Sequence, residues 1–227
     1  MNDVTVIIMA KECVPGRVKT RLHPPFSLED AASIARAALD DTIAAVREVD
    51  AGRVLCVQGE LAPVEGFDQV PQAAGDLDDR IADVLDRVAG PVLLIGMDTP
   101  QVDPELLGAL AHRWPLGVDA WFGPAADGGF WLLGLREAHV GGKPRGDLVR
   151  GVAMSQDDTG AVQRARLVDA GLSVADLPLL TDVDDLTSLR TVAAELDGSS
   201  ALLRLLDARH RDTVPTASAL GSRGGAS

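Results

Sequence analysis

Four basic side chains lie close together near the N-terminus of a chain that is acidic overall. They are Lys11, Arg17, Lys19 and Arg21, and Glu12 is the one acidic residue among them. Lysine and arginine neutralise phosphate oxygens, while the backbone amides of a flexible loop hydrogen-bond them. The segment matches neither the G-x-x-x-x-G-K-S/T pattern nor the G-x-G-x-x-G pattern. It predicts a phosphate-binding loop of another kind, with a solvated loop whose cations balance nearby acids as the alternative.

Carboxylates follow two predicted strands further along the chain. Asp98 comes directly after a continuous apolar run, and Asp182 and Asp184 follow a short strand near the C-terminus. Carboxylates in such positions can hold a hard cation such as Mg²⁺ that bridges substrate phosphates. The alternative is a turn or a helix N-terminus, where acids complement the helix dipole. We prefer that alternative for Asp185 and keep both interpretations for the other three.

Glycines and one carboxylate interrupt a cluster of aromatic residues. The segment is Asp127, Gly128 and Gly129, and Phe130 and Trp131 follow it. Paired glycines allow a ligand to approach the backbone closely, and the rings could form the wall of a pocket. Side chains alternate along a strand, so one of the two rings should face the site and the other the core. A plain hairpin turn is the alternative.

Gln72 and Gly75 lie just before a predicted helix. A side-chain amide can read the edge of a nucleobase, and the glycine permits close approach. A helix-capping turn is the alternative. The histidines form no cluster along the sequence, and no Ser/His/Asp or Cys/His arrangement indicates nucleophilic hydrolysis.

The composition excludes several classes of protein. The 227 residues include 34 acidic and 21 basic side chains, a formal net charge of -13, which argues against nucleic-acid and anionic-membrane binding. Two cysteines cannot form a disulfide framework, which indicates a reduced compartment. We expect neither secretion nor membrane insertion, because residues 1–4 show no basic segment before an apolar one and no apolar run reaches about 18 residues. We expect a cytoplasmic protein with small-molecule partners, and the sequence leaves a homodimer open.

Strands and helices alternate along the chain. Apolar runs predict strands at 4–9, 53–58, 91–97, 119–122, 130–135 and 173–177, and periodic segments predict helices at 27–49, 75–88, 104–112, 158–170 and from about 185 and 200. This pattern predicts an α/β three-layer domain with a mostly parallel sheet, modified by an antiparallel pair within 119–135. We expect one domain over 1–212, a mobile loop at 141–151, no regular element at 10–26 and disorder at 213–227. Ligands of such sheets bind beyond the carboxyl ends of the strands, where the cations and carboxylates above lie.

Five motifs, in this order, resemble the DUF2064 family of the GT-A nucleotide-diphospho-sugar transferase superfamily. They are M-A-K-x-x-x-P-G-x-x-K-T-R-L (9–22), P-Q-x-x-G-D-L (71–77), G-M-D-T-P-Q (96–101), G-P-A-x-D-G-G-F-W (123–131) and D-V-D-x-x-x-S (182–188). The resemblance spans about residues 3–195. It implies a Rossmann-like GT-A sheet, with a nucleotide at the loop after the first strand and Mg²⁺ or Mn²⁺ at the aspartate after the fourth.

The resemblance also implies roles for individual residues. The phosphates would be held by Lys11, Arg17, Lys19 and Arg21, the base by Gln72 and Gly75 with Asp76 beside them, the metal by Asp98 with Asp182 or Asp184, and further substrate contacts would come from Asp127, Gly128 and Gly129. Among these, Asp98, Lys19 and Arg21 would be catalytic.

Two features of the sequence favour nucleotidyl transfer. Expelling pyrophosphate from a triphosphate requires several cations, and the loop at 11–21 carries them. Glycosyltransferases of the superfamily usually have Asp-x-Asp after the fourth strand, whereas here Met97, Asp98 and Thr99 offer one carboxylate. We predict a Mg²⁺-dependent nucleotidyltransferase that joins a nucleoside triphosphate to a phosphorylated small-molecule acceptor. Glycosyl transfer from an NDP-sugar is the alternative, and a non-catalytic nucleotide-binding regulator is the alternative from another class.

Overall fold

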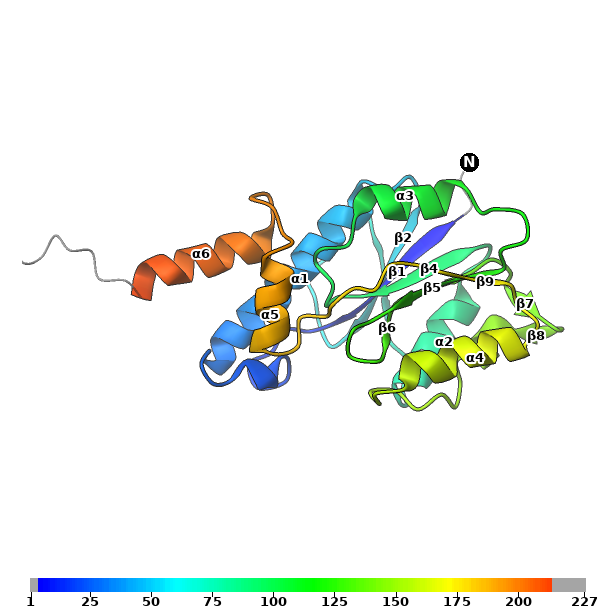
Figure 1. Ribbon diagram of the computed structural model, residues 1–227, viewed down its shortest axis with the longest axis horizontal. Helices are drawn as coiled ribbons and strands as arrows, with labels where there is room; N and C mark the ends of the chain where they lie inside the picture. Colours follow the sequence, from blue (N-terminus) through cyan, green and yellow to red (C-terminus); the bar gives the residue numbers. More distant parts are fainter. Residues whose placement is uncertain (1–3, 214–227) are drawn as a thin grey trace, which may run out of the picture.

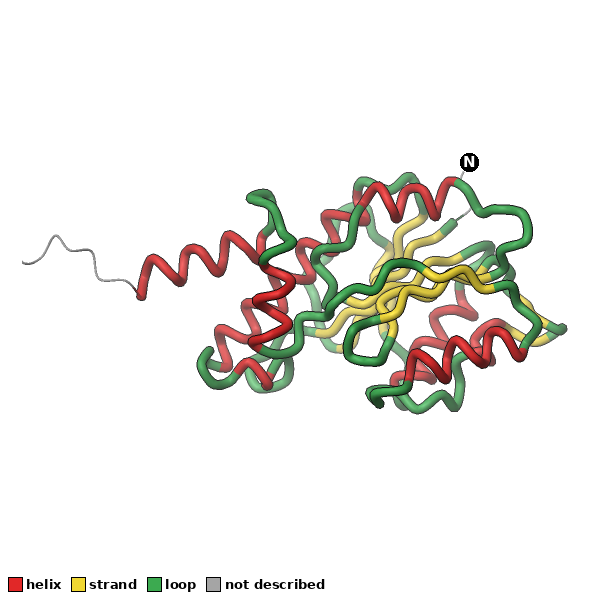
Figure 2. The backbone as a smooth tube through the Cα atoms, viewed as in Figure 1, coloured by secondary structure: helices red, strands yellow, loops and turns green. Residues whose placement is uncertain are grey.

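A mixed sheet of seven strands lies at the centre of the protein (Figures 1 and 2). The computed structural model describes residues 4–213. In chain order the strands are β1 (Thr5–Lys11), β2 (Gly52–Gln58), β3 (Asp68–Pro71), β4 (Val92–Gly96), β5 (Ala120–Pro124), β6 (Phe130–Leu135) and β9 (Val174–Asp176). Their spatial order is β3-β2-β1-β4-β6-β5-β9. Strand β6 is antiparallel to both β4 and β5, and the other pairings in this sheet are parallel. The mostly parallel sheet and the antiparallel pair within 119–135 were predicted, and the antiparallel pairing of β6 with β4 was not.

Helices cover both faces of the sheet. The helices within residues 4–213 are α1 (Leu28–Arg47), α2 (Leu77–Arg87), α3 (Pro104–His112), α4 (Thr159–Asp169), α5 (Leu186–Ala193) and α6 (Ala201–Thr213). Two short 3-10 turns, η1 (Thr20–Leu22) and η2 (Arg145–Leu148), and a small hairpin of β7 (His139–Val140) and β8 (Lys143–Pro144) complete the fold. Helices α1 and α3 lie on one face, and α2 and α4 on the other (Figure 1). The predicted three-layer α/β architecture is therefore confirmed.

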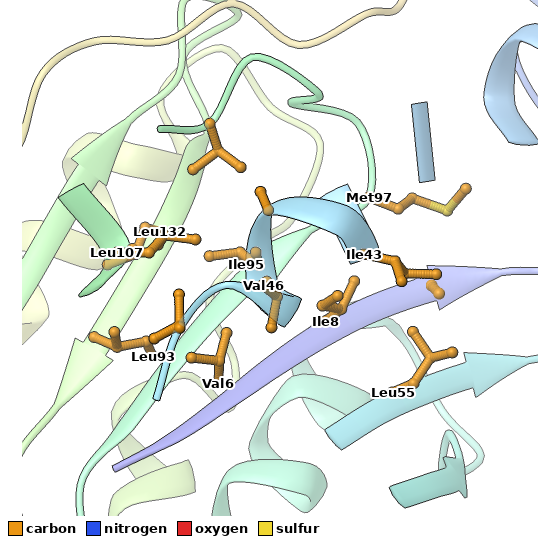
Figure 3. Packing of buried hydrophobic residues seen from close by; sticks show 14 of the residues in the cluster. Val6, Ile8, Ile43, Val46, Leu55, Leu93, Ile95, Met97, Leu107 and Leu132 are labelled. Carbon is orange, nitrogen blue, oxygen red and sulfur yellow. The ribbon is translucent and has the colours of Figure 1, made fainter. Parts of the chain in front are cut away.

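The central strands bury side chains on both faces, which explains their continuous apolar sequences. In β1, Val6 and Ile8 pack with α1 and α3 (Figure 3), whereas Ile7 and Met9 pack with α2. The same alternation places Leu93 and Ile95 of β4 in the first cluster. The carboxyl ends of β1 and β4 are thereby held side by side at one edge of the sheet.

A third apolar cluster joins α1 to α5 and α6. Leu22 and Val183, both fully buried, belong to it. Leu22 directly follows Arg21, and Val183 lies between Asp182 and Asp184. The cluster therefore anchors two of the polar segments that the sequence singled out.

Several sequence-based expectations need correction. The loop expected to be mobile at 141–151 contains the fully buried Arg145, whose guanidinium donates hydrogen bonds to three backbone carbonyls at the end of α2. Within 10–26, β1 extends to Lys11 and η1 forms a short turn. Strand β3 was not predicted, because Asp68 and Pro71 are weak strand formers and the segment is a half-exposed edge. Thr213 ends α6, and the rest of the tail expected to be disordered lies outside the described residues.

None of the helices within residues 4–213 has the length and apolar character needed to cross a bilayer.

Candidate nucleotide site

Two adjoining cavities open at the carboxyl ends of β1 and β4. The first, about 350 Å³, is polar and is lined by Lys19, Arg21, Asp98, Asp127, Ser155, Gln156, Asp157, Asp182 and Asp184. The second, about 260 Å³, is more apolar and is lined by Met9, Leu77, Ile81, Leu94, Gly96, Asp98, Asp127, Gly129, Phe130, Trp131, Met154, Ser155, Gln156, Thr159 and Asp182. We call them the polar cavity and the apolar cavity. They share five lining residues, so a ligand could extend through both: Asp98, Asp127, Ser155, Gln156 and Asp182.

Lys19 reaches the polar cavity from a loop that is held down on both sides. Val18 packs on α1, and Leu22 is fully buried against α1 and α5. Lys19 itself has a left-handed backbone, with a φ of 48°, at the start of η1. Its side chain is 8% exposed, and its ammonium lies 2.8 Å from Oδ1 of Asp98. Lys19, a predicted phosphate-binding residue, therefore contacts Asp98, the predicted metal ligand.

Arg21 forms the second contact across the polar cavity, an ion pair with Asp184. This pair is exposed, so its own contribution to stability is small. Asp184 is positioned by its neighbours, because its backbone N–H donates to Oγ of Ser188. Asp185 caps α5 through a capping box with Ser188, which confirms the capping interpretation for that aspartate.

Asp182 is a half-buried carboxylate of the polar cavity. The backbone N–H of Val183 donates to the carbonyl oxygen of Asp98, which ties this segment to the end of β4. Oδ1 of Asp182 is buried and meets no hydrogen-bond donor among the described residues. Burial, together with the neighbouring carboxylates of Asp98 and Asp127, raises the pKa of Asp182 to about 7.

This raised pKa predicts a specific dependence of stability on pH. The usual pKa is 3.8, so the folded protein holds the proton more tightly than the unfolded chain. The free energy of unfolding should therefore fall as pH rises from about 4 to about 7, by up to about 4 kcal/mol, because one pKa unit corresponds to about 1.4 kcal/mol. Asp182→Asn should remove this part of the dependence. Chemical denaturation in EDTA between pH 5 and 8 would measure this dependence, with the exposed Asp169→Asn as a control. Parallel curves of unfolding free energy against pH for the wild type and Asp182→Asn would contradict the raised pKa.

The turn between β5 and β6 brings Asp127 to both cavities. Oδ1 of Asp127 accepts a hydrogen bond from the backbone N–H of Gly129. Gly128 has a φ of +89°, and a Cβ there would lie 1.9 Å from the carbonyl oxygen of Asp157. The N–H of Gly160 donates to the carbonyl of Gly128. The glycines therefore let the turn approach the start of α4 closely, rather than leaving open space for a ligand.

The segment before α4 was missed by the sequence-based prediction. Ser155 and Gln156 line both cavities, and Asp157 lines the polar one. Ser155 has a positive φ of 58°, a backbone conformation that non-glycine residues adopt rarely. The run of polar residues at 155–159 was the available signal, since it precedes a helix in the same way as the segments that were singled out.

Six predicted residues line neither cavity as the structure describes them: Lys11, Arg17, Gln72, Gly75, Asp76 and Gly128. The ammonium of Lys11 donates to the carbonyl of Arg17, within the same loop. The amide of Gln72 donates to the carbonyls of Ala10 and Cys56 at the ends of β1 and β2. Gly75 approaches Asp79 closely. Their proposed contacts with a ligand remain predictions.

The aromatic pair follows the predicted alternation only in part. Trp131 is buried, as expected for a ring that faces the core, while the half-buried Phe130 contacts Phe122. The prediction that one ring faces the core and the other the site is therefore only partly met.

The carboxylates of the polar cavity suit a divalent cation that phosphate oxygens also bind. Residues 4–213 hold no group of three or more His, Cys, Asp or Glu side chains arranged for a metal ion. Asp98 and Asp182 are nevertheless neighbours, and Oδ1 of Asp182 is buried without a donor among the described residues. Mg²⁺ commonly takes one or two carboxylates and completes its coordination with phosphate oxygens and water. The pair therefore suits a cation that arrives together with phosphates.

Comparisons with known proteins agree with this architecture. The family described as "Uncharacterized protein conserved in bacteria (DUF2064)" matches residues 30–156, more than half of the chain. A crystal structure from Desulfovibrio desulfuricans G20, provisionally named a nucleotide-diphospho-sugar transferase, superposes with a TM-score of 0.76 at 25% identity, over 93% of this chain and 98% of that one. A cytidylyltransferase from Leptospira borgpetersenii superposes with a TM-score of 0.51 at 11% identity, over 92% and 94% of the two chains, which shows a shared fold.

One curated protein is similar over a shorter stretch. A stretch of 86 residues is 38% identical to 2-phospho-L-lactate guanylyltransferase from Methanoregula boonei. The stretch spans 38% of this chain and 39% of that protein.

Proposed function

The chain belongs to the DUF2064 family, and we propose that it is a transferase that passes the nucleotidyl group of a nucleoside triphosphate to a small-molecule acceptor. The observation that carries this proposal is the arrangement of the polar cavity, where Lys19 faces Asp98 and Arg21 faces Asp184 at the carboxyl ends of parallel strands. The guanylyltransferase similarity supports the same class of reaction.

In the structure, the cations and carboxylates neutralise one another across the cavity. Phosphate oxygens are acceptors for the same ammonium and guanidinium groups. When a triphosphate enters, Lys19 and Arg21 would exchange their carboxylate partners for phosphate oxygens. This exchange would leave Asp98, with Asp182, as ligands for Mg²⁺, which when bound supplies a Lewis acid for the phosphate oxygens. Nucleotide and metal are therefore expected to bind together, each strengthening the other.

The chemical step needs positioning and charge stabilisation rather than a covalent intermediate. An acceptor oxygen attacks the α-phosphorus, the bond from this phosphorus to the bridging oxygen breaks, and pyrophosphate leaves. Negative charge accumulates on the departing pyrophosphate, where Lys19 and Arg21 are placed to stabilise it. Asp127 and the segment 155–157 would limit the space in which the acceptor can lie.

Ligand binding measured by thermal unfolding tests this proposal. A triphosphate with Mg²⁺ at a hundred times its dissociation constant should stabilise the protein by about 2.7 kcal/mol. Lys19→Met should lose most of this stabilisation, whereas Lys143→Met, at an exposed site in the β7-β8 hairpin, should keep it. A preference for NDP-sugars over triphosphates would instead support glycosyl transfer. Triphosphate binding without metal-dependent pyrophosphate release would indicate a regulator.

A further inference from the structure

The apolar cavity differs in charge from the polar cavity that it adjoins. Of the described residues that line it, three are carboxylates, Asp98, Asp127 and Asp182, and none is lysine, arginine or histidine. Lys19 and Arg21 face the polar cavity. A group bound in the apolar cavity would therefore meet carboxylates, rings and aliphatic side chains.

The arginines of the helices beside this cavity have other partners. Helices α2 and α4 flank it, contributing Leu77, Ile81 and Thr159 to its lining. In α2, Arg80 contacts the carbonyl of Gly75 and Arg87 contacts Asp83. In α4, Arg164 contacts Asp176 and Arg166 contacts the carbonyl of Arg150. Their charges are thus directed to partners that lie outside the cavity lining.

The helix N-termini at the cavity do not favour an added anion. The first amides of a helix can bind an anion. In α4, however, the N–H of Thr159 donates to the carbonyl of Gln156, and that of Gly160 donates to the carbonyl of Gly128. The first turn of α2 carries two acids, Asp78 and Asp79, which complement its dipole.

We propose that the apolar cavity binds an uncharged, hydroxyl-bearing body of the acceptor, and that it rejects a carboxylate at this position. The inference rests on the proposed function, because the polar cavity must hold the phosphates. A carboxylate in the apolar cavity would lose its hydration and find no basic side chain in the described lining, and it would lie beside the carboxyl groups of Asp98, Asp127 and Asp182. A divalent cation on Asp98 and Asp182 would balance those two charges and leave Asp127. Hydroxyl groups, in contrast, can donate hydrogen bonds to carboxylate oxygens while the carbon skeleton packs on Phe130 and Trp131.

This preference separates the chain from the relative in Methanoregula boonei. The acceptor named for that protein, 2-phospho-L-lactate, carries a carboxylate beside its phosphate. The structure assigns a different acceptor class to this chain, namely a phosphate ester whose remaining groups are neutral.

A matched pair of probes tests the inference. Glycerol 3-phosphate and 3-phosphoglycerate have the same number of carbons and one phosphate ester each, and they differ in a hydroxymethyl group against a carboxylate. Calorimetric titration of the full chain with Mg²⁺ should give binding of glycerol 3-phosphate at least about tenfold tighter. Met154→Lys places a cation at the half-buried wall of the cavity and should reduce or reverse this ratio. Leu116→Lys adds the same charge at a position that is 93% exposed and should leave the ratio unchanged.

The outcomes distinguish this inference from the proposed function. Equal affinities, tighter binding of 3-phosphoglycerate, or failure of glycerol 3-phosphate to bind would each overturn the inference. Lys19→Met should weaken both probes by the same factor, since both carry the phosphate. If Lys19→Met keeps the full stabilisation by a triphosphate with Mg²⁺, the phosphate assignment in the proposed function fails, whatever the ratio between the probes.

Discussion

Asp98→Asn should reduce turnover at least about a thousandfold while leaving the fold intact. The carboxylate is the one point where the end of β4, the ammonium of Lys19 and the neighbouring Asp182 meet. An amide carries no charge, so it would bind a divalent cation weakly and would release Lys19 from its ion pair. The backbone carbonyl of Asp98, which accepts the N–H of Val183, is unaffected by the substitution. The loss should therefore appear in kcat and in metal binding rather than in stability.

Two measurements check this expectation. Pyrophosphate release gives the turnover, and the affinity for Mn²⁺ in the presence of a nucleotide gives a readout that does not depend on activity. Asp169→Asn, an exposed aspartate at the end of α4, is the matched control and should behave like the wild type. Turnover within about tenfold of the wild type in Asp98→Asn would refute the catalytic role.

Arg145→Met should lower the free energy of unfolding by about 3 to 5 kcal/mol. The Arg145 guanidinium is fully buried and donates to the carbonyls of Leu85, Val88 and Gly90, with Nε 2.8 Å from the first and Nη1 2.6 Å from the last. The final carbonyls of a helix have no partner within the helix, and here one side chain satisfies that of Leu85 in α2 and two more in the turn that follows. Burial lowers the pKa of Arg145, and Asp86 partly offsets this effect.

Methionine has a similar length but no donor, so the substitution removes the donor from one buried and two partly buried carbonyls. Chemical denaturation followed by circular dichroism would measure the loss. Arg113→Met, at an exposed position after α3, should change the free energy of unfolding by less than about 0.5 kcal/mol. A comparably small change for Arg145→Met would show that these carbonyls find water or other donors.

The architecture was largely predictable because its signals are local. The apolar runs that became β1 and β4 are continuous, and such runs are typical of strands covered on both faces. Helix α1 begins at Leu28, directly after its N-cap Ser27, and α3 spans the predicted residues. The antiparallel pair was also visible as two short apolar runs around a glycine-rich turn. Strand β3 was not, since Asp68 and Pro71 are weak strand formers and the segment is half-exposed at the edge of the sheet.

The candidate site was only partly predictable. The neighbouring positions of Lys19 and Asp98 followed from the rule that adjacent parallel strands end at one edge, and the structure brings them to 2.8 Å. The same rule did not indicate which of the four similar cations would face the cavity. Lys11 and Arg17 have the same chemistry as Lys19 and Arg21, but only the latter two face the polar cavity. Whether any of them binds a nucleotide stays a prediction.

Sequence patterns by themselves determined the layers, the strand ends and the chemical types of side chain at those ends, because each depends on neighbours within a few residues. Only the tertiary structure decided which of those side chains meet. Burial of Val18 and Leu22 in apolar clusters orients the cations between them. The close contact of Gly128 with the chain before α4 brings Ser155 and Gln156 to the site. Both effects depend on packing between segments far apart in the chain, which no local pattern records.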